Sequence, residues 1–355
     1  MKNELPRYLN SALKRFASEL LCRSGVEPSI SEVVADVLVE GDLLGKSTHG
    51  LQLLGPYLKS IAAGEMKLTG TPRILKQKAG NTTMDGDYLP GPFVVRHAVE
   101  QALERIGEFG VVTTVIRRSH HIACLQAYLK PVTDLGYMMV LMSSDPSVKS
   151  VSAYGGVKPV CTPNPFAVGI PTSKDPILID VSASTTTNGR SMQLHKLGET
   201  FSSRCLLTSE GTPTNDPAVL FAEPAGTIQP LGGMDFGHKG FALAILVETL
   251  TSALGGYGRV DAPKQWGSSV YLQLIDPECF GGLENYRSET GFFAETCRAS
   301  GPESPGAPVR MPGEQGLALR ASQLKDGVRL YPAIMPSLEK WATQLGVEPP
   351  RPIGT

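Results

Sequence analysis

Between residues 93 and 142 the sequence alternates twice between a helical and a strand-like pattern, with a glycine at each change. Phe93–Phe109 has apolar residues at helical spacing and ends at Gly110, and the β-branched "VVTTVI" of residues 111–116 follows at once. Residues 125–135 repeat the helical pattern up to Gly136, and the strand-like "YMMVLM" comes next. The chain therefore has to combine helices and strands.

Helical patterns also occupy both ends of the chain. Apolar residues recur at helical spacing over residues 9–20, and "SLEKWATQLG" near the C-terminus predicts a final helix. Residues 151–233 contain short apolar runs separated by Pro, Gly, Ser and Thr, which predicts strands and loops with "PILID" as the clearest strand. A long helix over residues 238–254, a strand over "SSVYLQLI" and an irregular connection over residues 299–314 complete the prediction.

Size and composition are those of an ordinary soluble globular protein. A chain of 355 residues exceeds the length at which one hydrophobic core keeps growing. With 41% hydrophobic residues, 19% charged residues and a net charge of -1, nothing favours a nucleic-acid partner. No apolar run reaches the roughly 20 residues that span a membrane, and the N-terminus has no secretory signal, so we expect a cytoplasmic protein. The six scattered cysteines show no metal-ligand spacing.

The sequence lacks the G-x-G-x-x-G fingerprint of a Rossmann nucleotide-binding domain. The segment "GGMDFGHKG", residues 232–240, is instead predicted to be a glycine-rich loop that leads into a helix. Its N–H groups and the positive helix end would face an anion, and Lys239 would add charge. The alternative is a simple tight turn.

Four polar positions are candidates for chemistry. His49 in "KSTHG" is a proton donor at neutral pH or a structural residue. The adjacent His120 and His121 in "RSHHIAC" point in different directions, so we expect at most one of them to face a given site. Asn164, between two prolines, contacts a ligand or caps a turn, and Asp180, at a strand end, accepts from a ribose or caps a turn.

Taken in order, "STHG", "RSHHIAC", "TPNPFAVGIP", "LIDVSAS" and "GHKGFALAILVETL" resemble the malate/L-lactate dehydrogenase-like family of NAD(P)H-dependent oxidoreductases. The "SHH" and "GHKG" versions look closest to its Δ1-piperideine-2-carboxylate/Δ1-pyrroline-2-carboxylate reductases. The motifs span most of the chain in the family's order, which makes the set more specific than any one of them.

The resemblance implies a mixed α/β fold that is not a Rossmann fold, with a mostly antiparallel NAD(P)-binding sheet and a helical region formed by both chain ends. We expect residues 1–115 to form a helical region that carries the catalytic His motif and residues 116–298 to form the NAD(P)H-binding domain. Residues 299–355 would pack back on the first region. The family works as homodimers, so a homodimer is expected.

The resemblance also implies roles for individual residues. His49 would donate the proton to the substrate, next to the hydroxyl of Thr48. The cofactor, NADPH or NADH, would contact His121, Ile122, Ala123, Cys124, Leu125, Thr162, Asn164, Asp180, Val181, Ser182, His238 and Lys239, with His120 in support. NADPH is preferred, because Arg117, Arg118 and Lys239 are candidate partners for its 2'-phosphate.

Three substitutions depart from the family pattern, and the first, Thr48 in place of a serine, keeps the hydroxyl group. Leu53 stands where many relatives have an arginine that grips the substrate carboxylate, and Arg190 stands where the reductases have an aspartate that orients the catalytic histidine. We hypothesise that Arg190 binds the carboxylate from the other side of the pocket and that Asp145 supplies the missing acid. Alternatively, Arg190 lies on the surface and the substrate has no free carboxylate, or catalysis has been lost.

The predicted function is reduction of a small molecule with a C=N bond, a cyclic imine 2-carboxylate, or of a related C=O substrate. One alternative is a 2-hydroxy acid dehydrogenase of the malate or lactate type. Another is a repurposed or non-redox family member, with an altered substrate site at Leu53 and Arg190, that acts in specialised biosynthesis. No metal site is predicted.

Overall fold

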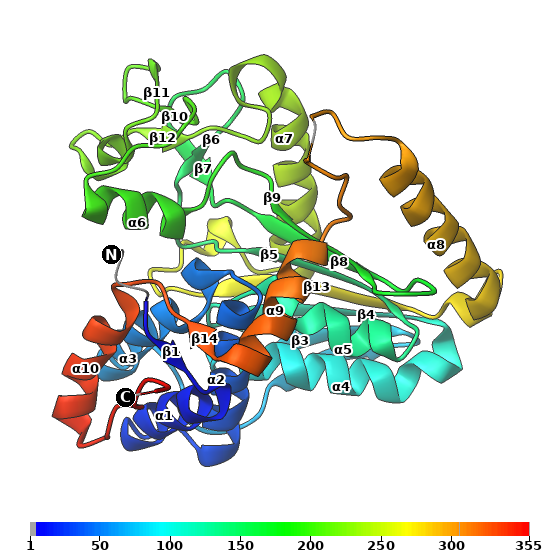
Figure 1. The fold of residues 1–355 in the computed structure, drawn as a ribbon, viewed down its shortest axis with the longest axis horizontal. Helices are drawn as coiled ribbons and strands as arrows, with labels where there is room; N and C mark the ends of the chain where they lie inside the picture. The colour runs from blue at the N-terminus through cyan, green and yellow to red at the C-terminus, as the bar shows by residue number, and fades with distance from the viewer. Residues whose placement is uncertain (1–4, 305, 355) are drawn as a thin grey trace.

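A seven-stranded sheet lies at the centre of the computed structural model, which describes residues 5–304 and 306–354 (Figure 1). Its strand order is β2-β3-β4-β13-β5-β8-β9. The pair β3–β4 is parallel, and the other five neighbouring pairs are antiparallel. The predicted mixed α/β fold with a mostly antiparallel sheet is therefore confirmed.

The strands and helices have the following bounds. The central sheet contains β2 (Arg73–Lys78), β3 (Asn81–Asp85), β4 (Val111–Ser119), β5 (Met138–Ser144), β8 (Pro165–Ile170), β9 (Ile177–Ser182) and β13 (Ser268–Ile275). The helices are α1 (Asn10–Arg23), α2 (Pro28–Leu43), α3 (Leu54–Ala62), α4 (Gly91–Phe109), α5 (Leu129–Asp134), α6 (Asn188–Leu197), α7 (Gly233–Glu248), α8 (Leu283–Ala299), α9 (Glu314–Asp326) and α10 (Ile334–Leu345).

Helices cover both faces of the central sheet. Side chains alternate between the faces along a strand. In β5, Met139 and Leu141 belong to the main core with α4 and α5, whereas Met142 packs with Val247 of α7 on the opposite face. Both faces of β5 are therefore buried, which explains why "YMMVLM" is continuously apolar.

The two ends of the chain meet in one helical region. β1 (Arg7–Tyr8) pairs with β14 (Val328–Arg329) in an antiparallel two-stranded sheet, and α10 packs against α1 and α3 (Figure 1). The boundary expected after residue 115 falls inside β4, and the three-domain division of the chain stays a prediction. Over residues 5–304 and 306–354, no helix is long and apolar enough to cross a membrane.

A smaller five-stranded sheet lies apart from the central one, in the order β11-β10-β12-β6-β7. Its strands are β6 (Val151–Ser152), β7 (Pro159–Cys161), β10 (Leu206–Leu207), β11 (Pro213–Thr214) and β12 (Thr227–Ile228). They enclose a second hydrophobic cluster, to which Val151, Leu206 and Ile228 belong. The strand-and-loop composition of residues 151–233 is explained by this sheet and by β8 and β9.

The prediction of a glycine-rich loop at residues 232–240 is wrong. Helix α7 begins at Gly233, five residues before the expected start, so most of this segment is helical. The glycines are needed for packing: a Cβ atom at Gly240 would collide with the backbone of Leu231, and one at Gly237 would lie 3.0 Å from the ring of Tyr154. The glycines within α7 therefore mark positions where the helix backbone comes close to neighbouring residues.

Two glycines of α4 provide a matched test of this packing argument. A Cβ atom at Gly91 would collide with the carbonyl oxygens of His120 and His121, while nothing lies within 4 Å of one at Gly107. We expect Gly91→Ala to lower the free energy of unfolding by about 1–3 kcal/mol through overpacking. Gly107→Ala should raise it by up to about 1 kcal/mol through helix propensity. Urea unfolding of both variants measures this, and equal effects would contradict it.

Candidate functional site

A cavity of about 670 Å³ lies between the turn that follows α2, strand ends of the central sheet and the first turn of α6. Its volume is in the usual range for small-molecule and cofactor sites, about 300–1,000 Å³. Of the residues predicted for the site, it is lined by Thr48, His49, Leu53, His121, Ile122, Ala123, Cys124, Leu125, Asp145, Thr162, Asp180, Val181, Ser182 and Arg190. The structure thus brings residues from six separate segments around one space.

His49 lies on a short 3-10 turn, Ser47–His49, directly after α2. The buried carboxylate of Asp42 in α2 accepts a hydrogen bond of 2.7 Å from the backbone N–H of Leu51 and so anchors this turn. Burial raises the pKa of Asp42 to about 8, so the group is largely protonated at neutral pH. A Cβ atom at Gly50 would lie 2.5 Å from that carboxyl group, which requires glycine after the histidine.

The segment that carries His121 leaves the end of β4 and is held by Tyr57 of α3. The Tyr57 hydroxyl lies 2.9 Å from the His121 carbonyl oxygen and 3.1 Å from its Nδ1. The backbone N–H of Ala123 donates to the same Nδ1 at 3.2 Å. A backbone N–H can only donate, so Nδ1 is an acceptor and the neutral ring carries its proton on Nε2.

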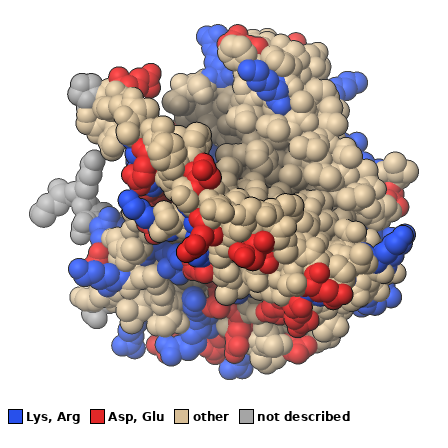
Figure 2. Space-filling view, turned by 90° about the vertical axis from the view of Figure 1, so that its right-hand side faces the viewer, with Lys and Arg blue, Asp and Glu red and all other residues tan. Residues whose placement is uncertain are grey.

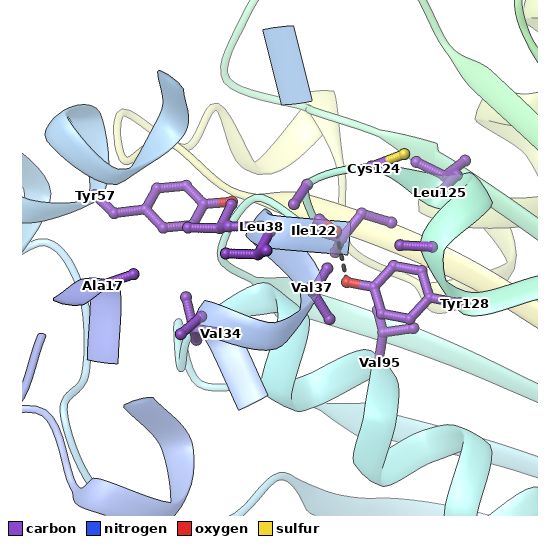
Figure 3. Close-up of a cluster of buried hydrophobic side chains, with 14 of the residues drawn as sticks. Ala17, Val34, Val37, Leu38, Tyr57, Val95, Ile122, Cys124, Leu125 and Tyr128 are labelled. Carbon is purple, nitrogen blue, oxygen red and sulfur yellow. Dashed lines mark hydrogen bonds between the residues drawn. The ribbon is translucent and has the colours of Figure 1, made fainter. Parts of the chain in front are cut away.

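The residues after His121 join the site to the main core. Ile122 and Cys124 lie near Val37 and Leu38 of α2, and the Tyr128 hydroxyl donates to the Ile122 carbonyl at 2.6 Å (Figure 3). Burial raises the pKa of the Cys124 thiol, so this side chain is a neutral wall and no thiolate nucleophile. The walls of the cavity therefore move only if the core moves.

The two site histidines and a tryptophan form a row of rings. The His49 and His121 rings are stacked with centroids 6.0 Å apart, and Trp266 lies 4.9 Å from His121 on a tilted plane. His120 is fully buried between Tyr57 and Trp266 and does not line the cavity. Burial lowers the pKa of His120 to about 3, so it stays neutral and supports the row by packing.

An ion pair borders His49. Lys46 Nζ lies 3.6 Å from Asp180 Oδ2, and both residues line the cavity. The pKa of His49 is lowered chiefly by burial; the negative charge of Asp180 opposes this shift and the positive charge of Lys46 adds to it. The charge state of His49 thus depends on two neighbours of opposite sign.

Asp145, expected to orient His49, is engaged elsewhere. Its Oδ1 accepts from the backbone N–H of Ser147 at 2.8 Å and from the Ser147 hydroxyl at 2.7 Å. The group that lies 2.8 Å from His49 Nδ1 is the Thr48 hydroxyl. Asp145 still lines the same cavity, and Asp180 is the carboxylate whose charge acts on His49.

Three residues predicted to contact the cofactor do not line the cavity. Asn164 is fully buried, accepts from Thr162 and donates to Ala244 and Glu248 of α7. His238 and Lys239 are exposed in the first turns of α7. The two candidate 2'-phosphate partners Arg117 and Arg118 bind the buried Asp85 instead. The resemblance to the family implies the first three contacts, and neither a resemblance nor the local sequence shows where a side chain points.

Arg190 is exposed at the rim of the cavity. It is the third residue of α6, whose first turn packs on the His49 turn, since a Cβ atom at Gly189 would lie 3.1 Å from Thr48 Cβ. Arg190 Nη1 donates to Gln193 Oε1 at 3.2 Å, and Gln193 in turn donates to Gln52 at 2.6 Å. The rim is thus built from α6 and from the segment that carries His49 and Leu53.

Sequence reasoning missed three residues of the site. Lys46 lies within the quoted "KSTHG" motif, but its partner Asp180 is far away in sequence. Tyr57 and Trp266 contact His121 only through the fold. The local signal that could have indicated Trp266 is a tryptophan in the segment between the predicted helix over residues 238–254 and the predicted strand "SSVYLQLI".

Comparison with known proteins decides the family. The model of the malate/L-lactate dehydrogenase family matches residues 10–339. The chain belongs to this family. The L-lactate dehydrogenase of Cupriavidus necator is 28% identical over 348 residues, which is 96% of this chain and 98% of that protein.

Two solved structures of the family share the fold. The malate dehydrogenase of Pyrococcus horikoshii superimposes with a TM-score of 0.88 at 24% identity over 98% of both chains. The Δ1-piperideine-2-carboxylate reductase of Pseudomonas syringae pvar. tomato superimposes with a TM-score of 0.83 at 23% identity, over 95% of this chain and 99% of the other. A protein named malate dehydrogenase and one named Δ1-piperideine-2-carboxylate reductase thus share the fold of this chain.

The Lys46–Asp180 pair predicts opposite shifts in the titration of His49. Lys46→Met removes a cation that lowers the pKa of His49, so this pKa should rise. Asp180→Asn removes an anion that raises it, so the pKa should fall. NMR titration of the His49 ring measures both, with Lys196→Met, an exposed cation outside the cavity, as the control. Shifts of the same sign in both variants would refute the arrangement.

Proposed function

We propose that the protein is an NAD(P)H-dependent reductase of a C=N substrate, a cyclic imine 2-carboxylate, or of a related C=O substrate. The observation that carries this proposal is the facing pair of His49 and His121 in a cavity of cofactor size. Both rings are polar and half-buried, and hydrogen bonds from Asp42 and Tyr57 anchor the segments that carry them. Such a site offers a proton donor and a second hydrogen-bond donor at one place.

The cavity fits a nicotinamide cofactor. Its volume is sufficient for a ligand of that class, and Ser182, Ser184 and Thr185–Thr187 supply hydroxyl groups along one wall for ribose or phosphate oxygens. The His121 Nε2–H offers a donor for a carboxamide or substrate oxygen. When bound, the nicotinamide would supply the hydride, and the chain would supply position and the proton.

His49 would deliver that proton. Its Nδ1 contacts the Thr48 hydroxyl, so the opposite nitrogen, Nε2, is the one to protonate the substrate nitrogen or oxygen that gains charge. Because burial lowers the pKa of His49, its charged form is a stronger acid than a histidine in water. In the reverse direction the neutral ring accepts the proton from a hydroxyl group, and Asp180 stabilises the charge that then forms.

Imine and ketone reduction both remain open to this site. The "SHH" motif and the reductase fold neighbour favour the imine, while the family's hydroxy-acid members favour a 2-hydroxy acid dehydrogenase of the malate or lactate type. A repurposed or non-redox protein, active in specialised biosynthesis, is the third candidate, because Leu53 and Arg190 change the substrate side of the cavity.

Arg190 is the proposed carboxylate partner. Its guanidinium lies at the rim of the cavity that contains His49, and a guanidinium binds a carboxylate through two parallel hydrogen bonds. The first turn of α6 adds the favourable field of a helix N-terminus beside Thr48. Gln193 joins this part of α6 to Gln52, next to Leu53, so both contributions belong to the same cavity.

The proposal includes NADPH and a homodimer. NADPH is preferred over NADH by resemblance to the imine reductases, and NADH is the alternative. A homodimer would cover apolar side chains on α7 and α8: Met234, Phe236, Ile245, Phe292 and Phe293 are each more than half exposed. Figure 2 shows that uncharged surface dominates the upper part of this side of the molecule, while charges gather below. Exposed apolar patches of this kind mark interfaces.

NADPH oxidation at 340 nm with cyclic imine carboxylates and 2-oxo acids tests the reductase proposal. We expect turnover of at least one class, and loss of about 100-fold or more of kcat in His49→Ala because general-acid catalysis contributes on that scale. NADPH binding by the variant, followed by its fluorescence, shows that the cavity is intact. Binding without turnover of any compound by the wild type would favour the repurposed protein.

Arg190→Ala tests the carboxylate partner. The KM of the carboxylate substrate should rise about tenfold or more, since a charge-assisted pair is lost, while kcat changes less. Arg204→Ala removes an equally exposed arginine outside the cavity and is the matched control. An unchanged KM in Arg190→Ala would exclude the role.

A further inference from the structure

Leu53 gives the cavity an apolar wall four residues after His49. It lies on the 3-10 turn Leu51–Leu53, is half-buried against the main core and faces the cavity. Trp266 is a second large apolar side chain in the lining, and it is fixed there by its contact with His121. A ligand group between these residues and His49 would meet carbon atoms and a neutral ring.

The charges of the lining residues are nearly balanced. In the described part of the chain, the cavity is lined by the cations Lys46 and Arg190 and the carboxylates Asp145 and Asp180. Lys46 is paired with Asp180, which leaves Arg190 as the cation free to meet an anion. Burial lowers the pKa of both His49 and His121, so neither ring adds a permanent positive charge.

A second anionic group on the substrate would therefore be unfavourable. It would have to lie against Leu53 and Trp266 without a cation to pair with, or close to Asp145 and Asp180, which repel it. Taking an unpaired carboxylate out of water is costly, whereas burying a methyl or methylene group is favourable. A cavity of this composition discriminates between substrates through the repulsion and desolvation of a second anion as much as through the attraction of the first.

We infer that the substrate carries one carboxylate, next to the reacting carbon, and an uncharged apolar group on the other side of that carbon. This inference rests on the proposed function, and it narrows the substrate to monocarboxylic 2-oxo or cyclic 2-imino acids. Compounds with a second carboxylate or with a sulfonate group are excluded as substrates. Leu53 is the specificity-determining residue.

Two unreactive analogues provide a matched test of the wild-type protein. N-ethyloxamate and N-oxalylglycine are both 2-oxo acid analogues and differ only in a terminal methyl or carboxylate group. Calorimetric titration of the NADPH-loaded protein should give at least about tenfold tighter binding of N-ethyloxamate, because the added carboxylate finds no cation. Equal or tighter binding of N-oxalylglycine would overturn the inference, and so would no binding of either compound.

Substitution at Leu53 tests the specificity role. Leu53→Arg should move the affinity ratio of the two analogues toward N-oxalylglycine by about tenfold or more, because it supplies the missing cation. Leu53→Gln, polar without charge, should change the ratio much less. Leu197→Arg adds the same charge on an exposed position of α6 outside the cavity and is the matched control. A folded Leu53→Arg protein with an unchanged ratio would refute the role of Leu53.

The binding test separates this inference from the reductase proposal. A protein that prefers N-ethyloxamate but turns over no C=O or C=N compound would refute the reductase and leave the shape and charge of the site as inferred. A reductase that turns over 2-oxo dicarboxylates as efficiently as apolar monocarboxylates would retain the proposed function and refute the inference. If Leu53→Arg does not fold, the binding of the two analogues to the wild-type protein alone decides whether the inference holds.

Discussion

The close approach of two loops to Gly41 in α2 is the contact on which the site depends. A Cβ atom at this position would lie 2.9 Å from the His49 carbonyl oxygen and 3.3 Å from Cys124 Cβ. The turn that carries His49 and the segment that carries His121 therefore touch the same point of one helix. Since α2 lies in the main core, the 6.0 Å separation of the two rings is set by backbone packing and not by their own side chains.

Burial of this contact also determines its electrostatics. Removal of water lowers the pKa of His49 and His121 and raises that of Asp42, so the centre of the site is neutral at physiological pH. A neutral centre attracts no ions when it is unoccupied, and charges that arise during a reaction are weakly screened there. Lys46 and Asp180, at the edge of the cavity, are then the groups through which the protein adjusts the acidity of His49.

Much of the fold could be predicted from sequence because its periodic elements are long. "SSVYLQLI" is β13 residue for residue, and the helix predicted from Phe93 to Phe109 differs from α4 by two residues. The start of α7 could not be predicted, because its glycines serve tertiary contacts such as Gly240 against Leu231. Within the site, short motifs were enough to locate His49 and His121. Contacts between distant segments decide that Tyr57 and Trp266 belong to the site and that Asn164 does not.

The same distinction separates the fixed and the exchangeable parts of the site. His49 and His121 are held by contacts at Gly41, Gly50 and Gly91 that leave no room for another side chain, so a change there would disturb the core. Leu53 and Arg190 also line the cavity, but no such backbone contact fixes their side chains, and Arg190 is exposed. In the proposed reductase, these two residues are therefore the positions at which substrate preference can change while the pair of rings persists.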